Sequence, residues 1–395
     1  MTNNKEKKVL NVPNSTDRGN VIRNVPALRF PEFTDEWKKE QLGDIADFSK
    51  GAGISKEQLS EKGEPCILYG ELYTKYKSEV IYDIISKTDI DSTKSVRSQA
   101  NDVIIPSSGE TAEDIATARC VLKNNILLGG DLNIIRLHKH SGSFMSYQLN
   151  GKRKYDIAKV AQGVSVVHLY AEHLKGVNTY NPCMEEQEKI ARLLSLLDER
   201  IATQNKIIEK LQSLIKGLRV CCMQRVYGNN VYLSEIAQIY QPQTISSTEL
   251  TEDGFLVYGA NGIIGKYKDY NHETEQICIT CRGNTCGMVN YTKPMSWITG
   301  NAMVINTDKY QDKVCKRYLY HYLSAYNFNS IISGSGQPQI VRTPLEKLKI
   351  TLPTISEQKQ KAIIFDKIQD KIDINHKVLN LYIGQKQYLL RQMFI

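Results

Sequence analysis

The chain contains 395 residues, of which 41% are hydrophobic, and carries a formal net charge of +8. This length exceeds one ordinary core and predicts two or more domains, and the positive balance is compatible with an anionic partner without requiring one. No run of about 18 apolar residues occurs, and the polar N-terminal segment has no apolar leader, so we expect a soluble, cytoplasmic protein without a membrane partner.

Residues 1–28 are polar, with few apolar side chains, and are predicted to form a loosely attached tail. Residues 29–181 form the first predicted globular unit. Short apolar runs separated by turn residues are typical of β-strands, and they occur here at residues 66–69, 80–82, 103–105 and 133–137. A helix is predicted around residues 143–161. We therefore expect this unit to be rich in β-structure.

Residues 182–225 are predicted to form a long helix, because apolar residues recur there in alternating steps of three and four. One polar residue, Gln204, interrupts this heptad seam. We expect the seam to pair with another helix through Leu194, Leu197, Ile201, Gln204, Ile208 and Leu211.

Residues 226–352 repeat the order of features of the first unit, and residues 353–395 repeat the helix. Both helices follow a proline, Pro182 or Pro353, and both open with Glu-Gln. The second seam has its polar residue at the matching step and consists of Phe365, Ile368, Ile372, Asn375, Leu379 and Tyr382. The chain is therefore a tandem repeat, and we predict an α+β fold in which each of two β-rich domains is followed by a long helix.

Gln204 and Asn375 lie near the middles of the two predicted helices. If the helices pair as an antiparallel coiled coil, the two amides would face each other. A buried polar pair of this kind fixes the register of pairing at some cost in stability. The alternative is that each amide lies at a frayed edge or contacts water.

This layout resembles the specificity subunit of type I restriction-modification systems. The resemblance covers nearly the whole chain after the tail. Its most specific parts are the proline and Glu-Gln openings, the twin heptad helices, the segment Arg29-Phe30-Pro31-Glu32-Phe33 with Trp37, and the ending at Tyr388 to Phe394. The resemblance implies that the two globular units are target-recognition domains, each reading one half of a split DNA sequence. It also implies that the helices form an antiparallel spacer that docks methyltransferase subunits.

The resemblance further implies a subunit with no catalytic residues and no cofactor of its own, which directs adenine methylation and DNA cleavage by other chains. Its partners would be double-stranded DNA, two methyltransferase subunits, and restriction subunits that act as motor and nuclease. Those partners would bind S-adenosylmethionine, ATP and Mg²⁺. The sequence itself contains no amino-methyltransferase, helicase or Gly-rich cofactor motif. An alternative is a two-domain coiled-coil scaffold without DNA binding, which would lack a salt-dependent affinity for DNA.

The candidates for DNA contacts lie in three kinds of segment. Basic-aromatic clusters follow Tyr69-Gly70 and Tyr258-Gly259, Gly-centred loops follow the apolar runs 103–105 and 277–279, and a polar strip precedes the last helix. Lys and Arg attract phosphates, whereas Asn, Gln, Ser, Thr and Arg can read base edges. Any one of these residues could equally be an ordinary surface residue. The predicted DNA-binding residues are Lys75, Tyr76, Lys77, Ser107, Ser108, Glu110, Thr111, Lys266, Tyr267, Lys268, Arg282, Asn284, Thr285, Gln337, Gln339 and Arg342.

The nine cysteines are irregularly spaced, unlike those of a disulfide framework, and are interpreted as reduced thiols. Cys278, Cys281 and Cys286 begin with a spacing that suggests zinc. No second cysteine pair or nearby histidine accompanies them, and the matching positions of the first unit carry no thiol, so no metal site is expected. Four histidines without a carboxylate or cysteine at catalytic spacing are expected to be structural or surface residues: His138, His140, His168 and His173.

Overall fold

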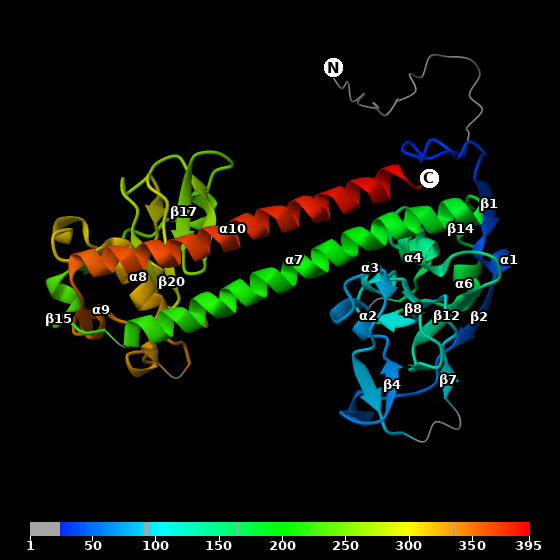
Figure 1. Cartoon of the computed structure of the whole chain (residues 1–395), viewed down its shortest axis with the longest axis horizontal. Helices are drawn as coiled ribbons and strands as arrows, with labels where there is room; N and C mark the ends of the chain where they lie inside the picture. The colour runs from blue at the N-terminus through cyan, green and yellow to red at the C-terminus, as the bar shows by residue number, and fades with distance from the viewer. Residues whose placement is uncertain (1–23, 91–94, 164–165, 225, 335) are drawn as a thin grey trace, which may run out of the picture. The chain divides into compact units, whose positions relative to one another are not determined.

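A computed structural model describes residues 24–90, 95–163, 166–224, 226–334 and 336–395 (Figure 1). Residues 1–23 of the predicted tail lie outside the described residues. The chain divides into two compact units, of which the first comprises the chain up to Ile201 with Leu381–Ile395, and the second comprises Ala202–Asn380. Each unit therefore contains a part of both long helices, α7 (Met184–Gln224) and α10 (Ile355–Gln392).

The first unit contains two five-stranded sheets and two strand pairs. The central sheet has the order β2 (Ala46–Lys50), β12 (Leu132–Leu137), β8 (Asp102–Pro106), β10 (Arg119–Val121) and β5 (Val80–Ile81). The other sheet has the order β3 (Leu59–Ser60), β6 (Ser86–Thr88), β4 (Glu64–Ile67), β11 (Leu127–Leu128) and β7 (Val96–Arg97). The strand pairs are β1 (Lys38–Gln41) with β14 (Asn178–Asn181), and β9 (Ser108–Gly109) with β13 (Val167–His168).

Strand β8 is buried along its whole length, because both faces of the central sheet are covered. Alternate side chains of a strand point to opposite faces. Val103 and Ile105 belong to one apolar cluster, and Ile104 belongs to another. This explains why residues 103–105 of β8 are a continuous apolar run rather than an alternating one.

The described residues of the first unit also form the short helices α1 (Leu42–Ile45), α2 (Glu71–Thr74), α3 (Ala112–Ile115), α4 (Gly142–Asn150), α5 (Lys154–Val160) and α6 (Ala171–Lys175). The single helix predicted around residues 143–161 is wrong in continuity, because α4 and α5 are separate. The break lies at Gly151, whose backbone leaves the helical region and whose N–H closes the last turn on the carbonyl of Tyr147 at 2.9 Å.

The second unit repeats this plan with fewer strands. Its central sheet has the order β16 (Gln238–Tyr240), β22 (Ala302–Asn306), β19 (Ile277–Thr280) and β20 (Val289–Tyr291). A three-stranded sheet follows the order β18 (Gly262–Tyr267), β17 (Phe255–Gly259) and β21 (Trp297–Ile298), and β15 (Asn229–Tyr232) pairs with β23 (Lys349–Leu352). Its helices are α8 (Lys316–Ala325), which packs against β20 (Figure 1), and α9 (Arg342–Glu346).

The repeated Pro and Glu-Gln openings have a physical role at the start of each long helix. The side-chain amide of Gln187 donates to the carbonyl of Pro182 at 2.9 Å, and Gln358 donates to Pro353 at the same distance. Each glutamine also accepts a backbone N–H from its own globule, from Ser141 in the first unit and from Cys315 in the second. The motif therefore fastens each helix to the domain that precedes it.

Within each unit, the parts of α7 and α10 run antiparallel. In the first unit, Leu194 and Leu389 share an apolar cluster, and Arg200 donates to the hydroxyl of Tyr382 at 3.4 Å. In the second, Gln204 contacts Asn375, and Lys361 lies within hydrogen-bonding distance of the carbonyl of Cys222. The predicted α+β fold, with tandem β-rich domains each followed by a long helix, is confirmed.

Candidate nucleic-acid interface

In the second unit, a Gly-centred loop follows strand β19 and is held by backbone hydrogen bonds on both sides. The N–H of Cys281 donates to the carbonyl of Asn301 at 3.2 Å, and the carbonyl of Cys281 accepts from Ile340 at 3.0 Å. Gly283 has a φ of +86°, a conformation that favours glycine. The backbone around this loop is thus fixed by main-chain hydrogen bonds rather than by its side chains.

This arrangement places Arg282 beside Gln339. The two residues form an antiparallel β-bridge, and both side chains are exposed. They come from predicted segments that lie far apart in the sequence, so the fold brings the loop and the polar strip together. A guanidinium with two parallel donors and an amide with a donor and an acceptor are the groups that recognise guanine and adenine edges.

The predicted residues that neighbour this pair in the sequence differ in their surroundings. Asn284 and Gln337 are exposed, whereas the hydroxyl of Thr285 donates to the side chain of Asn261. Arg342 is exposed at the start of α9, where its Nε donates to Glu346 at 2.7 Å. The nearby Glu346 carboxylate partly offsets the positive charge that Arg342 offers to a phosphate.

In the first unit, the predicted loop residues have different surroundings. Ser107 is buried, with its N–H donating to the carbonyl of Asp131 at 2.7 Å, so its side chain is not at the surface as expected for a DNA contact. Ser108 is half-buried in β9, and Glu110 is exposed. Thr111 caps helix α3 by accepting the N–H of Asp114 at 3.1 Å, which gives it a structural role.

The prediction for Tyr76 requires a correction, because its side chain is only 6% exposed. Its ring lies in an apolar cluster with Leu72 and Ile81, and its hydroxyl accepts the N–H of Ile85 at 3.2 Å. Burial raises the pKa of Tyr76 to about 12. Tyr76 is therefore a core residue in this structure and has no surface to offer to DNA.

The lysines beside Tyr76 differ in their availability. Lys75 donates to the buried carboxylate of Glu71 at 2.6 Å and to the hydroxyl of Ser86 at 2.9 Å. Because Glu71 also accepts the N–H of Leu68 at 3.0 Å, this ion pair ties helix α2 to the second sheet of the unit. Lys77 is exposed. Of this predicted cluster, Lys77 is thus the more available cation.

The predicted equivalence between residues 75–77 and 266–268 is not kept by the structure. Lys75 follows a short helix, whereas Lys266 and Tyr267 are the last residues of strand β18. Tyr267 packs edge-on against Trp297, with ring centroids 5.1 Å apart, and the Lys268 amine lies 6.0 Å from the Tyr267 ring. The two clusters therefore have a similar order of residues but lie on different secondary structure.

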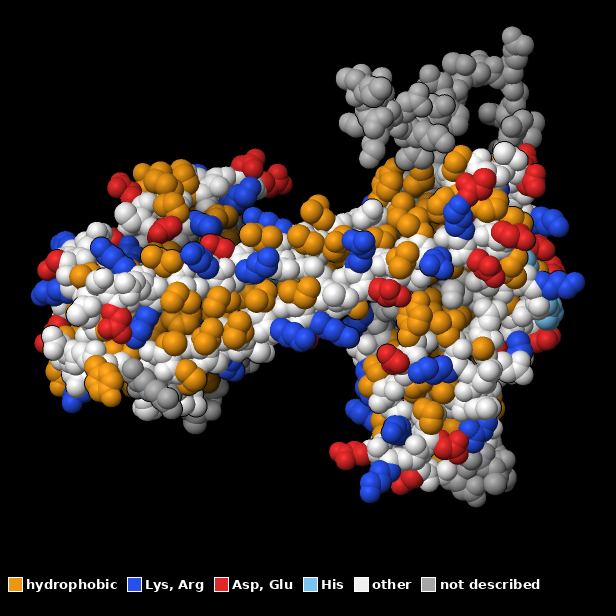
Figure 2. All heavy atoms as spheres, viewed as in Figure 1, with side chains coloured by type: hydrophobic (Ala, Val, Ile, Leu, Met, Phe, Trp, Pro, Cys, Tyr) orange, Lys and Arg blue, Asp and Glu red, His pale blue; other side chains and the backbone are white. Residues whose placement is uncertain are grey.

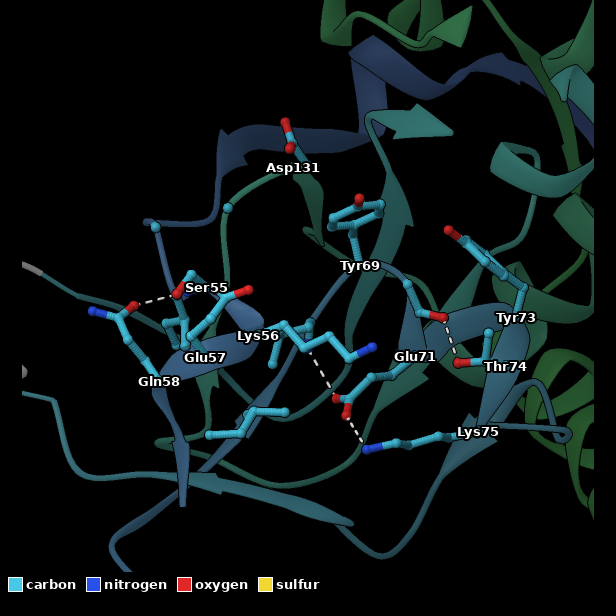
Figure 3. Close-up of a pocket in the computed structure, with 16 residues that line it drawn as sticks. Ser55, Lys56, Glu57, Gln58, Tyr69, Glu71, Tyr73, Thr74, Lys75 and Asp131 are labelled. Carbon is cyan, nitrogen blue, oxygen red and sulfur yellow. Dashed lines mark hydrogen bonds and ion pairs between the residues drawn. The ribbon is translucent and has the colours of Figure 1, made fainter. Parts of the chain in front are cut away.

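A cavity of about 870 Å³ lies beside helix α2 in the first unit (Figure 3). Lys56, Tyr69, Tyr73, Lys75 and Asp131 are among its lining residues, and Figure 3 shows the tyrosines and Asp131 above the Glu71–Lys75 ion pair. Asp131 follows Gly130 at the turn before β12, the turn that also holds Ser107. The cavity therefore adjoins the Gly-centred loop.

One residue outside the predicted set occupies the position that Gln339 has in the second unit. His168 pairs with Ser108 across β9 and β13, as Gln339 pairs with Arg282. His168 and Gln339 are related by the same offset of 171 residues that separates Gln204 from Asn375. The shared offset is the signal in the sequence that identifies this position, whereas a histidine without catalytic partners gives no such signal by its residue type.

The three cysteines at the zinc-like spacing occupy different surroundings. Cys278 is buried within β19, and burial raises the pKa of its thiol. The thiol of Cys281 lies 3.2 Å from the carbonyl of Asn301. Across the described part of the chain, no group of three or more His, Cys, Asp or Glu side chains is arranged to hold a metal ion. In the same residues, no helix combines the length and apolarity needed to span a membrane.

Comparison with known proteins identifies the family. The family described as "Type I restriction modification DNA specificity domain" matches residues 34–213 and 229–381. The EcoprrI specificity subunit of Escherichia coli is 31% identical over 147 residues, or 36% of each chain. The MjaVIII specificity subunit of Methanocaldococcus jannaschii is 24% identical over 413 aligned positions, covering 90% of this chain and 91% of that protein.

Solved structures agree on the fold. The S subunit of a type I restriction-modification system from M. genitalium is similar with a TM-score of 0.67 and 18% identity, covering 94% of this chain and 99% of that one. A chain from a structure on the assembly and conformational transition of the type I system has a TM-score of 0.54 and 14% identity, covering 91% and 97%. The chain therefore belongs to the type I restriction-modification specificity subunits, the non-catalytic subunits that recognise the DNA target.

Proposed function

We propose that residues 29–181 and 226–352 are two recognition domains, each of which reads one half of a split and asymmetric DNA target. The observation that carries this proposal is the side-by-side placement of Arg282 and Gln339 on a loop framework that also occurs in the first unit. The two units share the backbone arrangement and differ in the side chains on it. A target with two different halves follows from that difference.

In the second domain, Arg282 and Gln339 are the proposed base-reading residues. Both are exposed and held on adjacent extended segments, so their backbone positions are fixed before DNA binds. Arg282 is suited to the O6 and N7 acceptors of guanine, and Gln339 to adenine. Lys268, which follows β18, and Arg342, at the start of α9, are proposed to contact phosphates and set the orientation on the duplex.

The proposed protein partners are two methyltransferase subunits, one docked on each unit. In the second unit, Ile363 and Ile374 of α10 are each 54% exposed and lie eleven residues apart, about three helical turns. In the first unit, Leu381 and Tyr388 are 71% and 53% exposed and lie seven residues apart, about two turns. Each pair therefore shares one side of its helix, and exposed apolar side chains occur along the long helices in Figure 2.

Restriction subunits complete the proposed complex. We propose that these and the methyltransferase subunits bind S-adenosylmethionine, ATP and Mg²⁺, so that this chain supplies DNA recognition and assembly while adenine methylation and cleavage take place on its partners. The sequence carries no catalytic motif that would compete with this division of labour.

The test is to express the full chain with its methyltransferase subunits and map methylated adenines in the host genome. Arg282→Ala is expected to relax one base position in one half-site, at a cost of about 1–3 kcal/mol in discrimination. Arg192→Ala, which removes an exposed arginine from α7, is the matched control. Uniform weakening at all sequences with Arg282→Ala would mean a phosphate contact, and methylation without a consensus would contradict sequence recognition by this chain.

A further inference from the structure

We propose that His168 reads a base in the first half-site, as the structural equivalent of Gln339. The inference rests on the proposed function of the Gly-centred loops and extends it to a residue that lies outside the predicted DNA-binding set. His168 lies in β13, is exposed, and pairs with Ser108 of β9. Its function follows from its place in the fold rather than from its residue type.

The equivalence is carried by backbone hydrogen bonds that occur in both units. The N–H of His168 donates to Gln162 at 2.7 Å and its carbonyl accepts from Gln162 at 2.9 Å. Gln339 exchanges the same two bonds with Ser333, at 2.8 and 2.9 Å. A reciprocal pair of this kind fixes both residues on a narrow two-stranded ribbon. The side chains of His168 and Gln339 therefore start from the same backbone geometry.

The next residue of each ribbon is anchored in the same way. Leu169 donates its N–H to the carbonyl of Ser107 at 2.9 Å, and Ile340 donates to Cys281 at 3.0 Å. Leu169 and Ile340 are both buried, which leaves the preceding side chain on the opposite, exposed side. The two units thus have the same hydrogen bonds within the ribbon and the same hydrogen bond from the ribbon to the Gly-centred loop.

The chemistry of His168 suits a base edge. A neutral imidazole offers one donor and one acceptor, and a protonated one offers two donors. Among the described residues the ring of His168 makes no hydrogen bond, and it stacks on Tyr170 with ring centroids 6.2 Å apart and planes 29° apart. Tyr170 in turn contacts His173 edge-on at 5.7 Å. This aromatic row restrains the imidazole while leaving its nitrogens available to purine N7 or O6 acceptors.

The experiment uses the full chain assembled with its methyltransferase subunits and maps the methylated sites of four variants. His168→Ala is expected to relax one position of the half-site that Gln339→Ala leaves unchanged, by about 5- to 100-fold in relative methylation. His168→Gln is expected to shift the preferred base toward adenine, since glutamine pairs with adenine N6 and N7. His138→Ala is the matched control, because His138 is exposed in the same domain but lies against Asp47, away from the ribbon.

The outcomes separate this inference from the proposed function. Unchanged specificity of His168→Ala, or a change in the half-site governed by Gln339, would overturn the role of His168 while the recognition function stands. A wild-type complex that methylates without any consensus would instead remove the proposed function. Because His168 is exposed, the thermal midpoint of His168→Ala should match that of the wild type, and a loss of specificity in a normally folded variant is the supporting result.

Discussion

The side-chain amide of Gln204 donates to the side-chain oxygen of Asn375 at 2.5 Å and to its backbone carbonyl at 3.2 Å. Both residues are buried between α7 and α10 in the second unit. Asn375 also donates to the carbonyl of Lys371 at 2.6 Å. Gln204 thus donates to Asn375 inside an otherwise apolar seam, and the Asn375 amide finds its own acceptor one turn earlier in α10. A shift of the helices by one heptad in either direction would place Asn375 opposite a leucine, Leu197 or Leu211, and would separate the two amides.

Replacing one amide of this pair should destabilise the protein more than replacing both. Gln204→Leu leaves the Asn375 oxygen buried without its donor, which should cost about 1–3 kcal/mol. The double variant with Asn375→Leu should recover most of that loss, since both polar groups are then absent. Urea unfolding of the two single variants and the double variant measures the coupling. Additive losses would show that the hydrogen bond contributes nothing to stability.

The contact between Gln204 and Asn375 could be predicted from the sequence because the two halves of the tandem repeat can be compared with each other. The proline openings, the seams and the polar layer recur at one offset, and helix periodicity is a local property. The reciprocal backbone hydrogen bonds between Gln339 and Ser333 could not be predicted in this way, because bridge partners are fixed by the fold. The same offset of 171 residues relates His168 to Gln339, although a histidine and a glutamine have no residue type in common.

The burial of individual side chains was the property that could be predicted least well from the sequence. Tyr76 and Ser107 stand in polar surroundings in the sequence and are buried in the structure. Tyr76 is covered because strand β5 and the segment to Ile85 fold back over helix α2. A tyrosine between two lysines has the same sequence pattern whether its ring is covered or exposed. Side-chain exposure depends on these long-range contacts, which no local pattern contains.

A second buried group joins the C-terminal helix to the first unit. The amine of Lys386 donates to Glu79 and, at 2.5 Å, to Asp198, and the hydroxyl of Tyr147 donates to Asp198 at 2.7 Å. Lys386→Met would leave both carboxylates buried without their cation, at a cost of about 3–5 kcal/mol. Lys377→Met, at an exposed site of the same helix, should change stability by less than about 0.5 kcal/mol. Chemical denaturation of both variants checks this, and equal stabilities would contradict it.

His321 should make the second unit sensitive to acid. Its Nδ1 accepts from Nε of Arg219 at 3.1 Å and its Nε2 donates to Asp366 at 2.8 Å, so the ring is held neutral. Burial lowers the pKa of His321 below 6.5 more than the Asp366 contact raises it. As the pH falls below about 6.5, the unfolded chain therefore binds this proton while the folded chain does not. The free energy of unfolding decreases until the pH reaches the pKa of His321 in the folded chain.

The measurement is the urea midpoint at pH 7.5 and pH 5.5, which should be lower at pH 5.5. His140 and His272 also have lowered pKa values because of burial, so they contribute in the same direction. His321→Asn removes one titrating group and should reduce the difference between the two midpoints. His376→Asn, at an exposed position of α10, is the matched control and should leave the difference unchanged. An unaltered pH difference in His321→Asn would show that its protonation is not linked to folding.

The exposed apolar pairs on α10 should each hold one methyltransferase subunit. Leu381→Ser with Tyr388→Ser alters the first unit, and Ile363→Ser with Ile374→Ser alters the second. Each double variant is expected to assemble with one methyltransferase in place of two, because removing exposed apolar area weakens docking without opening a core. Gln385→Ser, an exposed polar change between the first pair, is the control. Native mass spectrometry of the purified complexes counts the subunits, and thermal melts of the isolated chain check folding. Two bound methyltransferases on either double variant would show that docking uses another surface.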